Sequence, residues 1–174
     1  MKISCSKILP LFALTVLSAT LSLPASETNS SLPLELQTFL RNADDFVLFS
    51  IESVPDFERK STNTFQNHVI LGQLEVKSVA TREKLIAALD KGIGEESASV
   101  PPDVTINLPD CFNPRHGIRA RKGDETVELL ICFECNQIYV TSHSATNQLF
   151  MTTGKPAATF NKVLKDAGVP LPTD

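Results

Sequence analysis

Apolar residues recur along this chain either at the spacing of a helix or in the alternation of a strand, and polar, proline-containing stretches separate these segments. The first periodic segment predicts a short amphipathic helix that ends near Asp44. Pro33 precedes it, which fits because proline is tolerated in the first turn of a helix. The apolar positions of this helix are Leu34, Leu36, Phe39 and Leu40.

Two strands are predicted next, over Phe46 to Ile51 and over Val69 to Val76, where β-branched and apolar residues prevail. Residues 53–67 lie between them. They are polar and turn-forming and have no sustained period, so we expect an exposed loop there.

The clearest helical stripe begins at Thr81, which is a candidate N-cap, and ends at Gly92 and Gly94. Glycine is common just past the end of a helix because it adopts the left-handed conformation without strain. Residues 95–110 hold three prolines and predict a second loop.

A β-hairpin is predicted where Ile118 to Arg121 and Val127 to Phe133 flank a short turn. If the chain reverses at Gly123 and Asp124, residues whose numbers sum to 247 face each other. A further strand is expected over Gln137 to Thr141. The hairpin register brings the segment before residue 118 close to the segment after residue 131.

The last element predicted is a helix from Pro156 to Ala167, with Gly168 as its stop. The resulting order is α-β-β-α-β-β-β-α. Strands fall in pairs and do not alternate strictly with helices, which favours an α+β domain with a mainly antiparallel sheet.

The N-terminus reads as a secretory signal peptide over residues 1–25. Lys2 and Lys7 precede an uncharged apolar segment from Ile8 to Leu23, and Ala25 is the expected last residue before cleavage. The apolar run is shorter than a membrane-spanning helix requires. We therefore expect an exported protein, periplasmic or extracellular, with a polar linker over residues 26–33 and a single domain over residues 34–174.

Removal of residues 1–25 leaves 14 basic against 20 acidic side chains, so the net charge changes from −4 to −6. Nucleic acids and anionic lipids require a cationic face. We expect neither as a partner, and no membrane association after cleavage. The sequence does not indicate any other partner.

Three cysteines and a histidine gather around the predicted hairpin. The register places Cys132 opposite Arg115, next to His116, and it places Cys135 opposite Phe112, next to Cys111. Cys5 lies inside the signal peptide and is lost on export.

A metal site is one chemistry that this cluster allows. Two residues between cysteines let one turn present both sulfurs to a tetrahedral zinc ion, and the remaining pair completes a four-ligand set that leaves no open position for catalysis. Arg115 would lower the thiol pKa by its charge. The predicted ligands are Cys111, His116, Cys132 and Cys135.

A disulfide is the second possibility, since exported proteins reside in oxidising compartments, and the register favours Cys111 with Cys135. The third is a thiol–disulfide oxidoreductase that uses Cys132 and Cys135. That chemistry usually needs a helix N-terminus beside the first thiol, and none is predicted here.

Other candidates for catalysis are weaker. His68 and His143 have no ligand-like neighbours in the sequence, and we interpret both as ordinary surface or hydrogen-bonded histidines. No residue is assigned a catalytic role, and a protein that is not an enzyme is favoured over an enzyme. An interaction module whose cysteines only staple the hairpin is a further alternative.

The segments CFNPRHGIRA, residues 111–120, and VELLICFEC, residues 127–135, resemble the paired signature of a group of small exported bacterial proteins of uncharacterised function. The resemblance brings no activity, substrate or cofactor. It implies that the residues of the signature form one site, namely Cys111, Pro114, Arg115, His116, Cys132 and Cys135.

Overall fold

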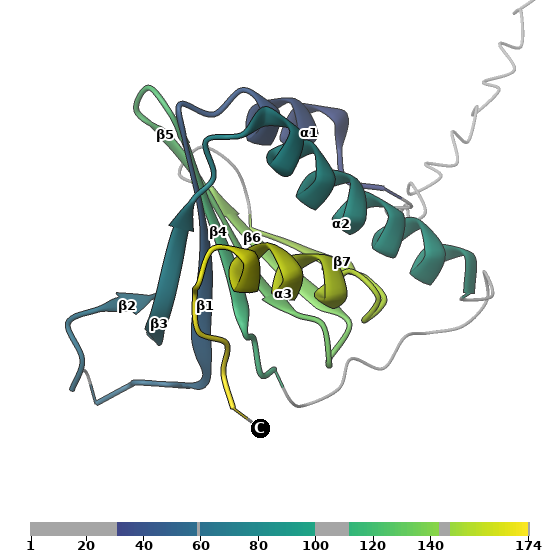
Figure 1. The fold of residues 1–174 in the computed structure, drawn as a ribbon. Helices are drawn as coiled ribbons and strands as arrows, with labels where there is room; N and C mark the ends of the chain where they lie inside the picture. Colours follow the sequence, from purple (N-terminus) through teal and green to yellow (C-terminus); the bar gives the residue numbers. More distant parts are fainter. Residues whose placement is uncertain (1–30, 59, 100–111, 143–146, 174) are drawn as a thin grey trace, which may run out of the picture.

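A computed structural model describes residues 31–58, 60–99, 112–142 and 147–173 (Figure 1). Helices and strands form two layers, with the helices on one face of a seven-stranded sheet. The elements in chain order are α1 (Leu34–Arg41), β1 (Asp45–Pro55), β2 (Thr64–Phe65), β3 (His68–Glu75), α2 (Val79–Ser99), β4 (His116–Lys122), β5 (Glu125–Cys132), β6 (Gln137–Ser142), β7 (Gln148–Met151) and α3 (Ala157–Asp166).

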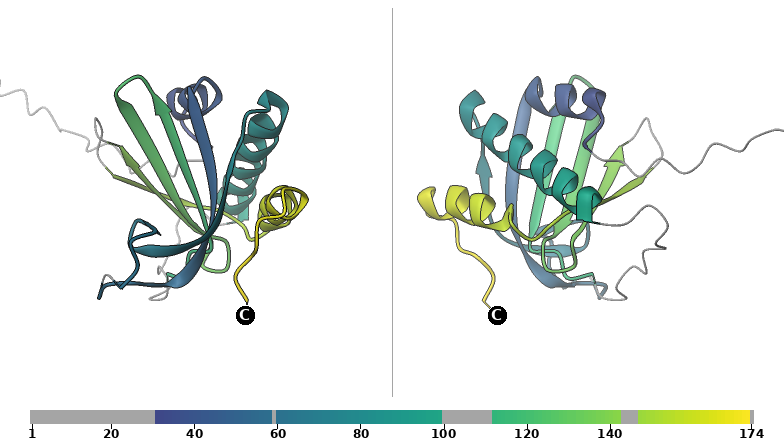
Figure 2. Two further views of the ribbon diagram at one scale, coloured as in Figure 1. Left: turned by 60° about the vertical axis from the view of Figure 1, so that its left-hand side comes forward. Right: turned by 90° about the vertical axis from the view of Figure 1, so that its right-hand side faces the viewer.

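The sheet has the strand order β2-β3-β1-β4-β5-β6-β7, and every neighbouring pair is antiparallel. It is strongly curled (Figure 2). This confirms the α+β class. Two strands were not predicted: the two-residue β2, inside the expected loop over residues 53–67, and β7 at the far edge.

The predicted hairpin register is confirmed. His116 pairs with Ile131 and Lys122 pairs with Glu125, so the two residue numbers of each pair sum to 247. Gly123 has a φ of 56°, a left-handed conformation that glycine adopts without strain. Its amide donates a hydrogen bond to Oδ2 of Asp44 over 3.0 Å.

The main hydrophobic core lies between the sheet and the helices. Helix α2 packs against α1, α3 and β7. Both views in Figure 2 place α2 and α3 on the same side of the sheet. The large side chains fully buried in this layer include Phe46, Leu48, Leu85, Leu89 and Phe160.

A smaller apolar cluster covers part of the opposite face of the sheet. Phe65 is the last residue of β2, and its ring stacks on that of Phe49 with a centroid separation of 4.6 Å. The guanidinium of Arg119 lies 5.3 Å from the centroid of the Phe65 ring. This cation–π contact closes the outer side of the cluster.

The second helix differs from its prediction at both ends. It starts at Val79, and Ser78 accepts a hydrogen bond from the Thr81 amide through its hydroxyl over 3.3 Å, so the predicted cap at Thr81 is wrong. It also continues through Gly92. A Cβ on Gly92 would meet Pro156, which shows that this glycine allows close packing and does not end the helix.

The C-terminal helix agrees with the prediction. It runs from Ala157 to Asp166, and Gly168 follows with a φ of 72°. In the part of the chain that the structure describes, none of the helices has the length and apolar character needed to cross a membrane.

Candidate functional site

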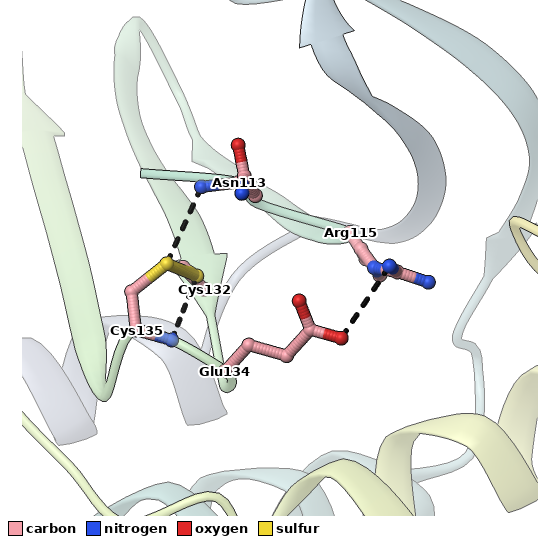
Figure 3. The surroundings of a disulfide bond; sticks show 5 residues. All are labelled: Asn113, Arg115, Cys132, Glu134 and Cys135. Carbon is pink, nitrogen blue, oxygen red and sulfur yellow. Dashed lines mark hydrogen bonds and ion pairs between the residues drawn. A yellow bond between two sulfur atoms is a disulfide. The ribbon is translucent and has the colours of Figure 1, made fainter. Parts of the chain in front are cut away.

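A disulfide bond closes the turn between β5 and β6. Cys132 is the last residue of β5, and its sulfur lies 2.10 Å from that of Cys135, with their Cα atoms 5.2 Å apart. Asn136 follows with a φ of 56°, a left-handed conformation that asparagine tolerates better than most residues, and it lets the chain enter β6 at once. Figure 3 shows the closed turn with Asn113 and Arg115 beside it.

Both sulfurs are shielded and hydrogen-bonded. Cys132 is fully buried and Cys135 is 5% exposed. The Asn113 amide donates to Sγ of Cys135 over 3.3 Å, and the Cys135 amide donates to Sγ of Cys132 over 3.0 Å. These contacts leave little room for an attacking thiolate.

The predicted disulfide between Cys111 and Cys135 is wrong, because Cys135 is bonded to Cys132. The physical reason is that the β4–β5 ladder does not extend to residue 135. The chain turns at residues 133–136, and this brings two cysteines of the same turn together. Cys111 itself lies outside the described residues, as does His143.

The histidine of the cluster occupies the helix-covered side. His116, the first residue of β4, is 4% exposed and lies among the rings of Phe133 and Phe160, at centroid separations of 5.2 and 5.7 Å. Its Nε2 lies 2.8 Å from Oδ1 of Asn161 on α3, so the ring proton sits on Nε2. Its Nδ1 is buried and has no hydrogen-bond partner among the residues that the structure describes.

Burial lowers the pKa of His116 to about 4. Loss of hydration is the largest cause, the hydrogen bond to Asn161 opposes it, and the nearby charge of Arg115 lowers the pKa further. The imidazole is therefore neutral at physiological pH.

The histidine and the disulfide lie on opposite faces of the sheet. His116 pairs with Ile131 and so shares its face, while Cys132, the next residue along β5, points the other way. Ile131 belongs to the helix-side core and Leu130 to the opposite cluster, as this alternation requires. Among the described residues no group of three or more His, Cys, Asp or Glu side chains is arranged to hold a metal ion.

Arg115 and Pro114 stand next to the histidine. Pro114 is buried, and Nη2 of Arg115 lies 3.4 Å from Oε1 of Glu134 in the disulfide-closed turn (Figure 3). The side chain of Arg115 is 25% exposed and that of Glu134 is 60% exposed. The disulfide loop thus presents a carboxylate directly to the guanidinium.

These residues frame a pocket of about 250 Å³. Four segments contribute to it: the start of β4, the closed turn, α3 and the C-terminal tail. Its lining residues are Asn113, Arg115, His116, Phe133, Glu134, Ala157, Asn161, Leu171 and Pro172.

The sequence identified Arg115, His116 and the cysteine turn, but it missed Asn161, Glu134 and the C-terminal tail. Glu134 could have been found, because it stands between the two cysteines. Nothing in the sequence links Asn161 to His116, since 45 positions separate them and only the packing of α3 on the sheet brings them together.

The second histidine that sequence reasoning considered, His68, is confirmed as a hydrogen-bonded structural residue. It is 5% exposed, and its Nδ1 lies 2.9 Å from the backbone oxygen of Glu52.

Compared with known proteins, the chain matches no family model, no curated protein and no solved structure.

Proposed function

We propose that this protein is an exported binding domain, in which the disulfide-closed turn forms one wall of a pocket that receives a small ligand. The observation that carries this proposal is the position of the turn. Phe133 and Glu134 lie between the two bonded cysteines, and both line the pocket beside Arg115 and His116. Small-ligand sites typically combine apolar walls with a few convergent polar groups, as here.

Export is supported by the signal-like residues 1–25 and by the disulfide, because such bonds persist mainly in oxidising compartments. When the full chain is expressed in a bacterial host, the periplasmic or secreted product should begin near Ser26. N-terminal sequencing checks this, and an intact Met1 on the exported product would contradict it.

A binding role is favoured over disulfide exchange by the surroundings of the sulfurs. Catalytic thiols are partly exposed and are activated at helix N-termini or beside cations, whereas Cys132 is fully buried and the turn joins two strands. The closed turn therefore acts as a rigid support for the pocket wall.

The pocket is tested with a pair of matched variants on α3. Ala157 lines the pocket, and Ala158 beside it is exposed. A library of small polar organic molecules is screened for compounds that raise the melting temperature of the exported protein. Such compounds should stabilise the wild type and Ala158→Phe but not Ala157→Phe, because only the latter fills the pocket. If no compound stabilises the protein, or if both variants respond alike, the binding function is wrong.

Native mass spectrometry separates the disulfide form from a zinc form and from free thiols. The proposal expects a mass two hydrogens below the reduced chain and no metal. A zinc adduct that is lost in Cys135→Ser would instead support ligation by Cys111, His116, Cys132 and Cys135, since thiolate ligands must be reduced. Rapid exchange of the bond with a small dithiol in the folded protein would support the oxidoreductase.

A further inference from the structure

The two ring nitrogens of His116 differ in their surroundings. Nε2 donates the ring proton to Oδ1 of Asn161 over 2.8 Å, and this leaves Nδ1 as a hydrogen-bond acceptor. Nδ1 is buried and has no partner among the described residues. Because buried polar atoms are nearly always hydrogen-bonded, this nitrogen requires a donor from outside the described structure.

The chemistry of that donor is restricted by the pKa of His116. Burial lowers this pKa to about 4, so at physiological pH the ring does not satisfy Nδ1 by taking up a proton. An ammonium donor would bring a positive charge to a place where burial and the charge of Arg115 already disfavour one. A neutral hydroxyl group donates a hydrogen bond without that cost.

The imidazole is also held in one orientation. Its ring packs against those of Phe133 and Phe160, at centroid separations of 5.2 and 5.7 Å, and these two rings contact each other edge to face at 5.2 Å. Together with the contact to Asn161, this packing fixes the direction of Nδ1. An acceptor that is already ordered loses little conformational freedom when a ligand binds.

The pocket that His116 lines suits a single aromatic ring. Phe133 belongs to its wall, and aromatic rings pack favourably on one another in offset or edge-to-face arrangements. Ala157, Leu171 and Pro172 add apolar surface. The volume of about 250 Å³ lies below the range of about 300–1,000 Å³ typical of drug-sized ligands, which indicates a smaller molecule.

We propose that the pocket binds a small phenol, whose hydroxyl group donates to Nδ1 of His116 and whose ring packs against Phe133. The hydroxyl supplies the donor that Nδ1 requires, and the ring covers the apolar wall beside it. This inference rests on the proposed binding function and names the ligand class of the same pocket.

NMR titrations of the protein with isotope-labelled histidine test the assignment. Phenol and p-cresol are each compared with toluene, which has the ring but no hydroxyl group. We expect both phenols to bind saturably and toluene to bind at least about tenfold more weakly, which corresponds to about 1.4 kcal/mol or more. Equal binding of toluene, or binding of neither phenol, would overturn the proposal.

The nitrogen resonances show which atom accepts the hydroxyl proton. On binding of phenol, the Nδ1 resonance of His116, assigned by its loss in His116→Gln, should move towards the range of a protonated ring nitrogen. His68 is the internal control, because its Nδ1 already contacts the backbone oxygen of Glu52 and it is not among the lining residues. If phenol binds but leaves the His116 resonance in place, or moves that of His68 equally, the proposal is wrong.

Ser50 is the competing donor within the protein. It pairs with His116 between β1 and β4, and its buried hydroxyl likewise has no partner among the described residues. Ser50→Ala should leave the affinity for phenol and the Nδ1 resonance of the free protein almost unchanged. If the substitution moves this resonance away from the protonated range in the free protein, the serine is the donor and the proposal is overturned.

The two levels of the proposal fail differently. If other compounds stabilise the wild type and Ala158→Phe but not Ala157→Phe, and no phenol binds, the ligand class is wrong while the binding function stands. If nothing binds in the pocket, both are wrong.

Discussion

Nε2 of His116 lies 2.8 Å from Oδ1 of Asn161, and this contact joins the first residue of β4 to α3 across the helix-side core. It is a neutral hydrogen bond inside a nearly closed aromatic environment. A proton added to His116 would have to be accommodated among these rings and near the positive charge of Arg115. The folded protein therefore resists protonation at this residue.

Stability should fall as the pH is lowered. The ordinary pKa of histidine is about 6.5, and burial lowers that of His116 to about 4 in the folded protein. Between these values the unfolded chain takes up a proton that the folded chain does not, so unfolding is favoured. The loss should approach about 3 kcal/mol as the pH falls from above 6.5 to below 4, and it levels off once the folded histidine is protonated as well.

Urea unfolding of the wild type and of His116→Gln at pH 7.5, 5.5 and 4.5 measures this effect. The stability difference between the two proteins should narrow as the pH falls, because glutamine does not titrate. Burial also lowers the pKa of His68, so the variant keeps part of the pH dependence. Parallel curves for the two proteins would show that His116 is not the titrating group.

The substitution Asn161→Asp should reverse the electrostatics of the same contact. A carboxylate at this distance favours the charged imidazolium, and it should raise the pKa of His116 relative to the wild type. An NMR titration of the His116 Cε1 proton measures the change directly. Lys162→Met, which removes a charge on the adjacent exposed position of α3, is the control and should leave this titration almost unchanged.

Much of the fold followed from local pattern, and most of the site did not. The hairpin register was predictable because Gly123 fixes the turn and the side chains of both strands alternate between two faces. The same register failed beyond Cys132, where a turn of four residues replaces the ladder. The sequence analysis interpreted Gly92 and Gly94 as the end of a helix. At Gly92, however, glycine is needed because Pro156, which is distant in the sequence, packs too closely for a side chain.

The metal prediction treated His116 and the cysteines as one cluster, since sequence spacing reports distance along the strands. It leaves out the alternation of side chains along a strand, which places His116 and Cys132 on opposite faces of the sheet. The partner of His116 is Asn161, and that pairing depends on how α3 packs on the sheet. Long-range packing of this kind leaves no periodic signal in one sequence.

Removal of the disulfide should cost about 2 kcal/mol of unfolding free energy. The bond closes a loop of only four residues, and the loop-entropy relation gives a small value for so short a loop. Urea unfolding of Cys132→Ala/Cys135→Ala without reductant tests this estimate. Adding reductant should destabilise the wild type by a similar amount and leave the variant unchanged. Equal sensitivity of both proteins to reductant would contradict the assignment of the bond.

The last prediction concerns Gly117 and Phe65 on the opposite face of the sheet. A Cβ added to Gly117 would clash with the ring of Phe65, which is itself fully buried and stacked on Phe49. Gly117→Ala should therefore destabilise the protein by about 1–3 kcal/mol, the usual cost of overpacking. This occurs even though alanine is otherwise favoured over glycine within a strand by roughly 0.5–1 kcal/mol.

A double-mutant cycle with Phe65→Leu distinguishes the clash from a backbone effect. In the Phe65→Leu background the ring is gone, so Gly117→Ala should cost less than it does in the wild type and can become stabilising. Gly123→Ala is the matched control, because no atom lies within 4 Å of its added Cβ and its cost comes from the φ of 56° alone. That cost should be the same in both backgrounds. If the costs of Gly117→Ala and Phe65→Leu are simply additive, the ring of Phe65 does not lie against Gly117 as described.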